Sequence, residues 1–89
     1  MTSMVEKVQE CAVRTRRNVA DLLAGAEEAE GRANELRSLV AVAGPGKDAT
    51  RWEKEALFFD SVAVAHRAQA EEFRRWLDGL PQNASGPRA

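Results

Sequence analysis

Few residues of this chain are of a type that does chemistry, and they stand far apart. The chain has one histidine, His66, and one cysteine, Cys11. A buried histidine can bind a metal or respond to pH, but a carboxylate-bridged metal pair needs Glu-x-x-His, and position 63 is alanine. A lone cysteine with no histidine partner favours packing in an interface over catalysis. We therefore expect no catalytic residue, cofactor or metal ligand, and keep two copies of His66 meeting in a dimer as an alternative metal- or ligand-binding site.

Five arginines are a second candidate site. Arg14, Arg16 and Arg17 form a small basic cluster, and Arg74 and Arg75 fall at the same end of an antiparallel hairpin. Such a cluster could contact phosphate or an acidic partner, but acidic residues lie among the arginines and no aromatic residues alternate with them. Without a glycine-rich phosphate loop or a nucleophile–base pair, the sequence predicts neither nucleic-acid binding nor an enzyme.

Composition indicates one small helical domain. The chain has 89 residues, a net charge of −1, 30% charged residues and 16 alanines, a bias typical of long helices and coiled coils. We expect no membrane-spanning helix and no signal peptide. A single cysteine fits a reducing compartment, so the expected location is the cytoplasm, with export without a cleaved signal as the alternative.

The apolar residues of the first half repeat at spacings of four and three without a break. This heptad pattern predicts a long helix, about residues 3–43, with a coiled-coil seam. Ser3-x-x-Glu6 matches a capping box at its start. The seam positions are Met1, Val5, Val8, Ala12, Thr15, Val19, Leu22, Ala26, Ala29, Ala33, Leu36, Val40 and Ala43.

Gly44-Pro45-Gly46 is the one strong break, and we expect a turn over residues 44–47. A second helix follows, about residues 48–79, with Thr50-x-x-Glu53 as its capping box and Asp48 as a rival cap. Residues 1–80 thus form the hairpin, and the polar residues 81–89 are expected to be disordered. The second seam comprises Trp52, Ala56, Phe59, Ala63, His66, Ala70, Phe73, Leu77 and Leu80.

The two seams fit each other when the chain folds back at Gly46. A short connection makes long helices antiparallel neighbours, and residues whose numbers add up to about 92 then face each other. Large residues mostly meet small ones, as Phe59 meets Ala33. At the flanks the same register predicts three ion pairs and one amide pair: Arg32 with Glu55, Arg37 with Asp60, Glu30 with Arg67, and Asn18 with Gln69.

Two surfaces stay uncovered in such a hairpin. The first residues of helix 1 pass beyond the end of helix 2, and the front half of helix 2 is apolar nearly all round. We therefore predict an all-α antiparallel hairpin that dimerises into a four-helix bundle, as a non-enzymatic protein–protein interaction module. Its partner is a second copy or another helical protein. The predicted interface residues are Met4, Val8, Cys11, Leu57, Phe58, Val62, Ala65 and Trp76.

The size and the helix–turn–helix outline are similar to the WXG100 family of small secreted dimers. The turn here is Gly44-Pro45-Gly46, and the nearest tryptophan begins Trp52-Glu53-Lys54 where that family has W-x-G. The resemblance implies, as an alternative function, an exported hairpin that acts as a heterodimer. Residues 64–71 also look like helical segments that precede sensor or RNA-binding domains in bacteria.

Overall fold

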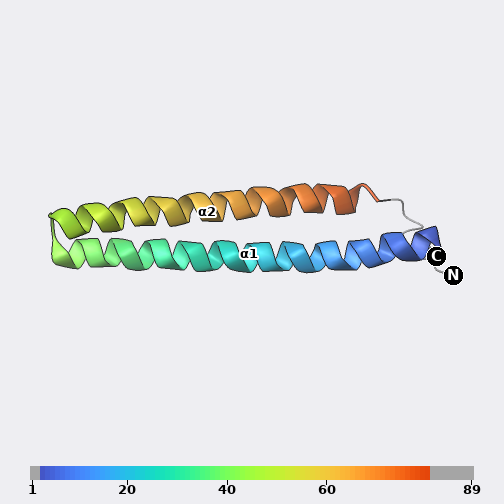
Figure 1. Ribbon diagram of the computed structural model, residues 1–89, viewed down its shortest axis with the longest axis horizontal. Helices are drawn as coiled ribbons and strands as arrows, with labels where there is room; N and C mark the ends of the chain where they lie inside the picture. The colour runs from blue at the N-terminus through green and yellow to red at the C-terminus, as the bar shows by residue number, and fades with distance from the viewer. Residues whose placement is uncertain (1–2, 81–89) are drawn as a thin grey trace.

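A computed structural model describes residues 3–80, which form two long helices and contain no strand. Helix α1 spans Met4–Ala43 and helix α2 spans Lys47–Asp78. They lie antiparallel side by side along their lengths, and the N-terminal end of α1 extends past the end of α2 (Figure 1). The predicted all-α antiparallel hairpin is confirmed. Two predictions lie outside the described residues: the seam position at Met1 and the disorder of residues 81–89.

Helix α1 begins where the sequence predicts. The Ser3 hydroxyl oxygen accepts a hydrogen bond from the Glu6 backbone N–H at 3.1 Å. This bond satisfies one of the N–H groups that a helix start leaves without a partner. The serine half of the capping box is therefore confirmed.

The turn is built on glycine backbone conformations. Gly44 has a φ of 76°, as expected for glycine after a helix end, but its ψ of −176° is extended rather than left-handed helical. This region of backbone space is open essentially to glycine alone. The Gly44 N–H donates to the Val40 carbonyl at 3.0 Å, which closes the last turn of α1.

Helix α2 begins earlier than the Thr50 capping box predicts. Gly46 stands before its first residue, Lys47, and Thr50 already lies in the first turn. The Thr50 hydroxyl donates to the Gly46 carbonyl at 3.1 Å instead of accepting at a helix start. The predicted Thr50 cap is therefore wrong. The earlier start adds Ala49, only 5% exposed, to the buried seam.

Alanine dominates the interior between the helices. Eight of the ten buried residues in the part of the chain that the structure describes are alanine, and Ala49, Ala56, Ala63 and Ala70 recur every seven residues along α2. Among residues 3–80 no large side chain is fully buried. The predicted seam positions are otherwise half-buried, apart from the helix ends, where Val5 and Ala43 are exposed. The helices thus pack through small side chains, and the hairpin encloses a thin core.

The larger side chains of the seam line the edges of this alanine interior. Phe59 packs against the buried cluster of Ala26, Ala29 and Ala63 and against the cluster that contains Ala33. Phe59 thus packs on the cluster in which Ala33 lies, in agreement with the predicted register. Trp52 packs on the second cluster, near the turn.

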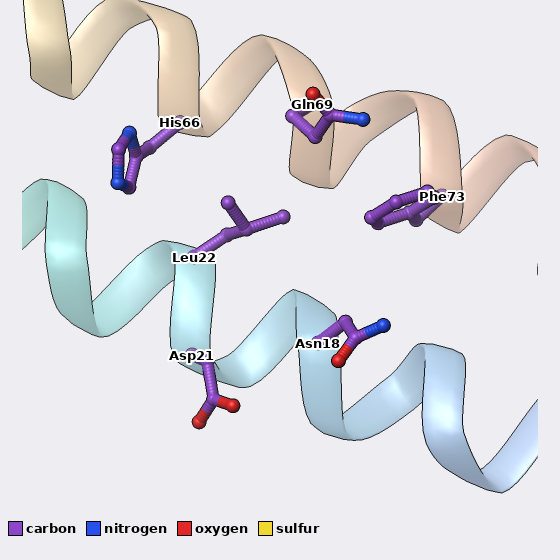
Figure 2. Close-up of a pocket in the computed structure, with 6 residues that line it drawn as sticks. All are labelled: Asn18, Asp21, Leu22, His66, Gln69 and Phe73. Atoms are coloured by element: carbon purple, nitrogen blue, oxygen red, sulfur yellow. The ribbon is translucent and has the colours of Figure 1, made fainter.

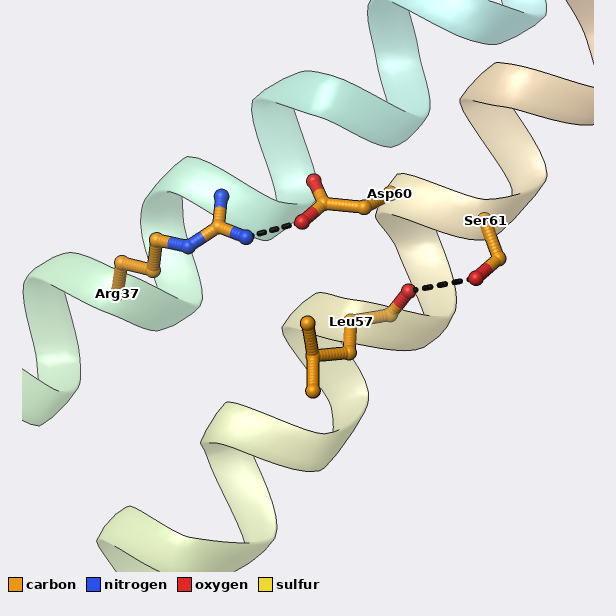
Figure 3. A network of polar contacts seen from close by, with 4 residues as sticks. All are labelled: Arg37, Leu57, Asp60 and Ser61. Atoms are coloured by element: carbon orange, nitrogen blue, oxygen red, sulfur yellow. Dashed lines mark hydrogen bonds and ion pairs between the residues drawn. The ribbon is translucent and has the colours of Figure 1, made fainter.

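Ion pairs along one edge hold the helices in register. Arg37 contacts Asp60 (Figure 3) and Glu30 contacts Arg67, so both of these predicted pairs are confirmed. All four side chains are partly exposed, and such pairs contribute about 0–1 kcal/mol each. They fix the alignment of the helices more than they stabilise the fold.

The predicted partner of Arg32 is wrong. Its Nη1 lies 3.3 Å from Oε2 of Glu35 in its own helix, and not next to Glu55. Its guanidinium carbon lies 5.9 Å from the centre of the Phe59 ring. A glutamate one turn away in α1 and the face of Phe59 on α2 satisfy this cation without a carboxylate partner on the opposite helix.

Candidate protein-interaction surface

The outward face of α2 carries an apolar surface, which we call the outer patch. It consists of Leu57, Phe58, Ser61, Val64, Ala65 and Ala68. These residues recur at helical spacing on the side of α2 opposite the seam alanines. Leu57, Phe58 and Val64 are 63%, 62% and 68% exposed. Three large apolar side chains thus face solvent within about two turns of one helix.

The single polar side chain of the outer patch, that of Ser61, is hydrogen-bonded to the backbone of its own helix. The Ser61 hydroxyl donates to the Leu57 carbonyl at 3.0 Å (Figure 3). Serine at the centre of a helix face commonly bonds back to the carbonyl four residues earlier. Because the hydroxyl already has a hydrogen-bond partner, burying the centre of the patch costs less free energy than burying an unpaired hydroxyl would.

Phe58 is held in place by its neighbour. The rings of Phe58 and Phe59 meet edge to face, with centroids 5.5 Å apart and an interplanar angle of 70°. Phe59 is anchored in the interior, so it restrains the exposed ring. An exposed aromatic ring that is already ordered loses little conformational freedom on binding.

The predicted interface residues on α2 divide between its outward face and its edge. Leu57, Phe58 and Ala65 belong to the outer patch. Val62 is half-buried against the cluster of Ala26, Ala29 and Ala63, so it packs at the edge of the hairpin itself. Trp76 is 45% exposed near the end of α2.

The other predicted interface residues lie near the start of α1. Met4 is 76% exposed, Cys11 is exposed and Val8 is half-buried. They form a second apolar surface, separate from the outer patch.

Sequence reasoning missed three members of the outer patch as site residues, Ser61, Val64 and Ala68. The signal for Val64 is its position seven residues after Leu57, which places both on one side of a helix. The signal for Ser61 is its place between two apolar turns, where a hydroxyl can bond to its own backbone.

His66 lines an open depression between the two helices. The other lining residues are Asn18, Asp21, Leu22, Gln69 and Phe73 (Figure 2). Asn18 and Gln69, the predicted amide pair, border the same depression. Within residues 3–80 no group of three or more His, Cys, Asp or Glu side chains is placed to hold a metal ion.

The His66 ring packs over Gly25 of α1. A Cβ atom placed on Gly25 would lie 2.8 Å from Cδ2 and 3.2 Å from Nε2 of His66, closer than such atoms normally approach. By contrast, a Cβ on Gly31 would meet nothing within 4 Å. Gly25 therefore makes room for the imidazole, which serves packing between the helices.

This contact predicts different outcomes for two glycine substitutions in α1. Gly31→Ala should stabilise the hairpin by about 0.5–1 kcal/mol, because alanine favours a helix over glycine. Gly25→Ala should stabilise it less or destabilise it, because the new methyl group displaces His66. Urea unfolding followed by circular dichroism measures both. In a His66→Ala background the two substitutions should become equal, and a difference that persists there would contradict the packing role.

The predicted basic cluster is an exposed surface. Arg14, Arg16, Arg17, Arg74 and Arg75 are all exposed. Arg14 borders a shallow depression on α1 together with Glu6 and Glu10. Acidic side chains thus accompany the arginines, as on an ordinary solvated helix face.

Comparison with protein-family models, with curated proteins and with solved structures found no match to this chain. Neither helix, within residues 3–80, has a segment both long and apolar enough to cross a membrane. The outer patch gathers three of the large apolar side chains that are exposed among residues 3–80, Leu57, Phe58 and Val64.

Proposed function

We propose that this chain is a non-enzymatic protein–protein interaction module, a helical hairpin that associates through the outer patch of α2. Association of two hairpins gives an assembly of four helices. The observation that carries the proposal is the exposure of Leu57, Phe58 and Val64, each above 60%, on one face of α2 within about two helical turns. Large exposed apolar patches on soluble helical proteins mark interaction surfaces.

The thin interior supports the same function. Among residues 3–80 the buried positions hold alanine, with one valine and one leucine, while Leu57, Phe58 and Val64 stay exposed. Burial of apolar area provides most of the stability of a fold, at about 25 cal/mol per Å². A hairpin that leaves its larger side chains exposed therefore gains stability by covering them with another helix.

The residues suited to chemistry support a role without catalysis. His66 packs over Gly25, and Cys11 is exposed near the start of α1. Neither lies in the outer patch, where the surface is apolar and has no cluster of titratable side chains. A single exposed thiol suits a reducing compartment, so we place the module in the cytoplasm.

Phe58→Glu tests the proposed function. Removing an aromatic anchor at the centre of an interface costs about 2 kcal/mol or more, which weakens association at least about 30-fold. Light scattering after size exclusion, over a dilution series, should show a dimer for the unmodified chain and a monomer for the variant at the same concentration.

Val42→Glu is the matched control, because Val42 is 89% exposed but lies on α1 next to the turn. This variant should associate like the unmodified chain. A monomeric unmodified chain, or a Phe58→Glu variant that stays dimeric, would contradict the proposed function.

A further inference from the structure

Opposite charges stand at the two ends of the outer patch. Arg51 and Lys54 precede it on the outward face of α2, and Glu71 and Glu72 follow it. All four side chains are exposed. The only ion pair that the structure gives any of them is the contact between Arg51 Nη2 and Asp48 Oδ1 at 3.5 Å, within the first turns of α2. The patch is thus an apolar strip with a basic end and an acidic end.

This charge pattern is complementary to a second copy of itself that runs in the opposite direction. From it we infer that the occupant of the outer patch is a second copy of this chain, with the two α2 helices antiparallel about a two-fold axis at Ser61. The inference rests on the proposed function and adds the partner and the alignment. Isologous two-fold contacts are the commonest form of self-association, and they require a surface that complements itself.

At this alignment the basic end of each α2 meets the acidic end of the other. Residues whose numbers add up to about 122 face each other, so Arg51 lies opposite Glu71, with Glu72 beside it. Lys54, which lies opposite Ala68 at this alignment, stands about one helical turn from the same acidic end. A parallel arrangement would instead place arginine and lysine against themselves and glutamate against itself. Charge complementarity therefore selects the antiparallel orientation.

The apolar residues fit the same alignment. Leu57 lies opposite Ala65, a large residue against a small one, and Phe58 lies opposite Val64. Ser61 lies on the axis, and its small side chain, bonded to Leu57, lets the two helices approach. The one like-charged combination, Lys47 with Arg75, falls at the outermost level, where solvent screens it.

Charge reversal tests this alignment. One variant carries Arg51→Glu and Lys54→Glu, a second carries Glu71→Lys and Glu72→Lys, and a third carries all four substitutions. In the antiparallel dimer each double variant places like charges opposite each other, which should weaken association by about tenfold or more. The fourfold variant restores opposite charges and should return to the affinity of the unmodified chain. Sedimentation equilibrium measures the three dissociation constants, and circular dichroism checks that each variant is helical.

The matched control is Arg14→Glu with Arg17→Glu. It changes the net charge as the first double variant does, but on the exposed surface of α1. This control should associate like the unmodified chain. Double variants that bind as tightly as the unmodified chain, or a fourfold variant that stays weak, would overturn the alignment and leave the proposed function standing. An unmodified chain that stays monomeric would overturn both.

Discussion

Ala33→Asp is expected to unfold the hairpin or bring it close to unfolding. Ala33 is 0% exposed and belongs to the cluster with Leu36 and Ala56, against which Phe59 packs. An aspartate there is too short to reach water past the neighbouring side chains. It must carry an unpaired charge into the seam or force the two helices apart.

The expected loss of stability is about 3 kcal/mol or more, the range for an uncompensated buried charge. For a chain of this size a loss of about 3 kcal/mol lowers the melting temperature by roughly 12–24 °C. Thermal unfolding followed by circular dichroism measures it, with all proteins at one concentration because association also raises stability.

Ala20→Asp is the control for this substitution. Ala20 is exposed on the same helix, so the change carries the same loss of helix propensity without entering the seam. Its melting temperature should change by only a few degrees. If Ala33→Asp melted like Ala20→Asp, the alanine seam would not be what holds the two helices together.

The hairpin itself was predictable from the sequence because one regular pattern runs through both helices. Alternating spacings of four and three place every apolar residue of the seam on one side of a helix, and a short glycine-proline turn makes the helices antiparallel. Once the fold point at Gly46 is set, the contacts of Arg37 with Asp60 and of Glu30 with Arg67 follow from the register.

The sequence pattern did not predict the ion-pair partner of Arg32 or the start of α2, because in both cases a local interaction competed with the predicted one. Arg32 pairs with Glu35, one turn away in its own helix, and lies over the ring of Phe59 on α2, so it does not pair with Glu55. The start of α2 depends on backbone conformations at Gly44 and Gly46 that a capping motif does not describe. Both outcomes depend on small energy differences between alternatives that have similar sequence patterns.

The outer patch was predictable only in part, for a geometric reason. A helix apolar on all sides shows that something covers it, but not which residues its neighbour already covers. Val62 turns toward the alanine seam, and Val64 turns away from it. This difference depends on the rotation of α2 about its own axis. That rotation is set by the packing of both seams against each other, and the pattern of one helix alone does not give it.

Two copies of Ser61 should lie next to each other if the outer patch joins two chains antiparallel. Ser61 is exposed at the centre of the patch, and a two-fold axis through it brings the same residue of both chains together. A disulfide forms only where two Cβ atoms approach to about 3.5–4.5 Å. A cysteine at this position therefore reports the alignment of the two helices directly.

The measurement uses Ser61→Cys in a Cys11→Ser background, because Cys11 is an exposed thiol that could form its own links. Ala24→Cys in the same background is the control, since Ala24 is exposed on α1. After mild oxidation at micromolar concentration, denaturing electrophoresis without reductant should show most of the Ser61→Cys chains as covalent dimers and few of the control chains. Equal and low yields from the two variants would contradict the claim that the outward face of α2 joins two copies of this chain.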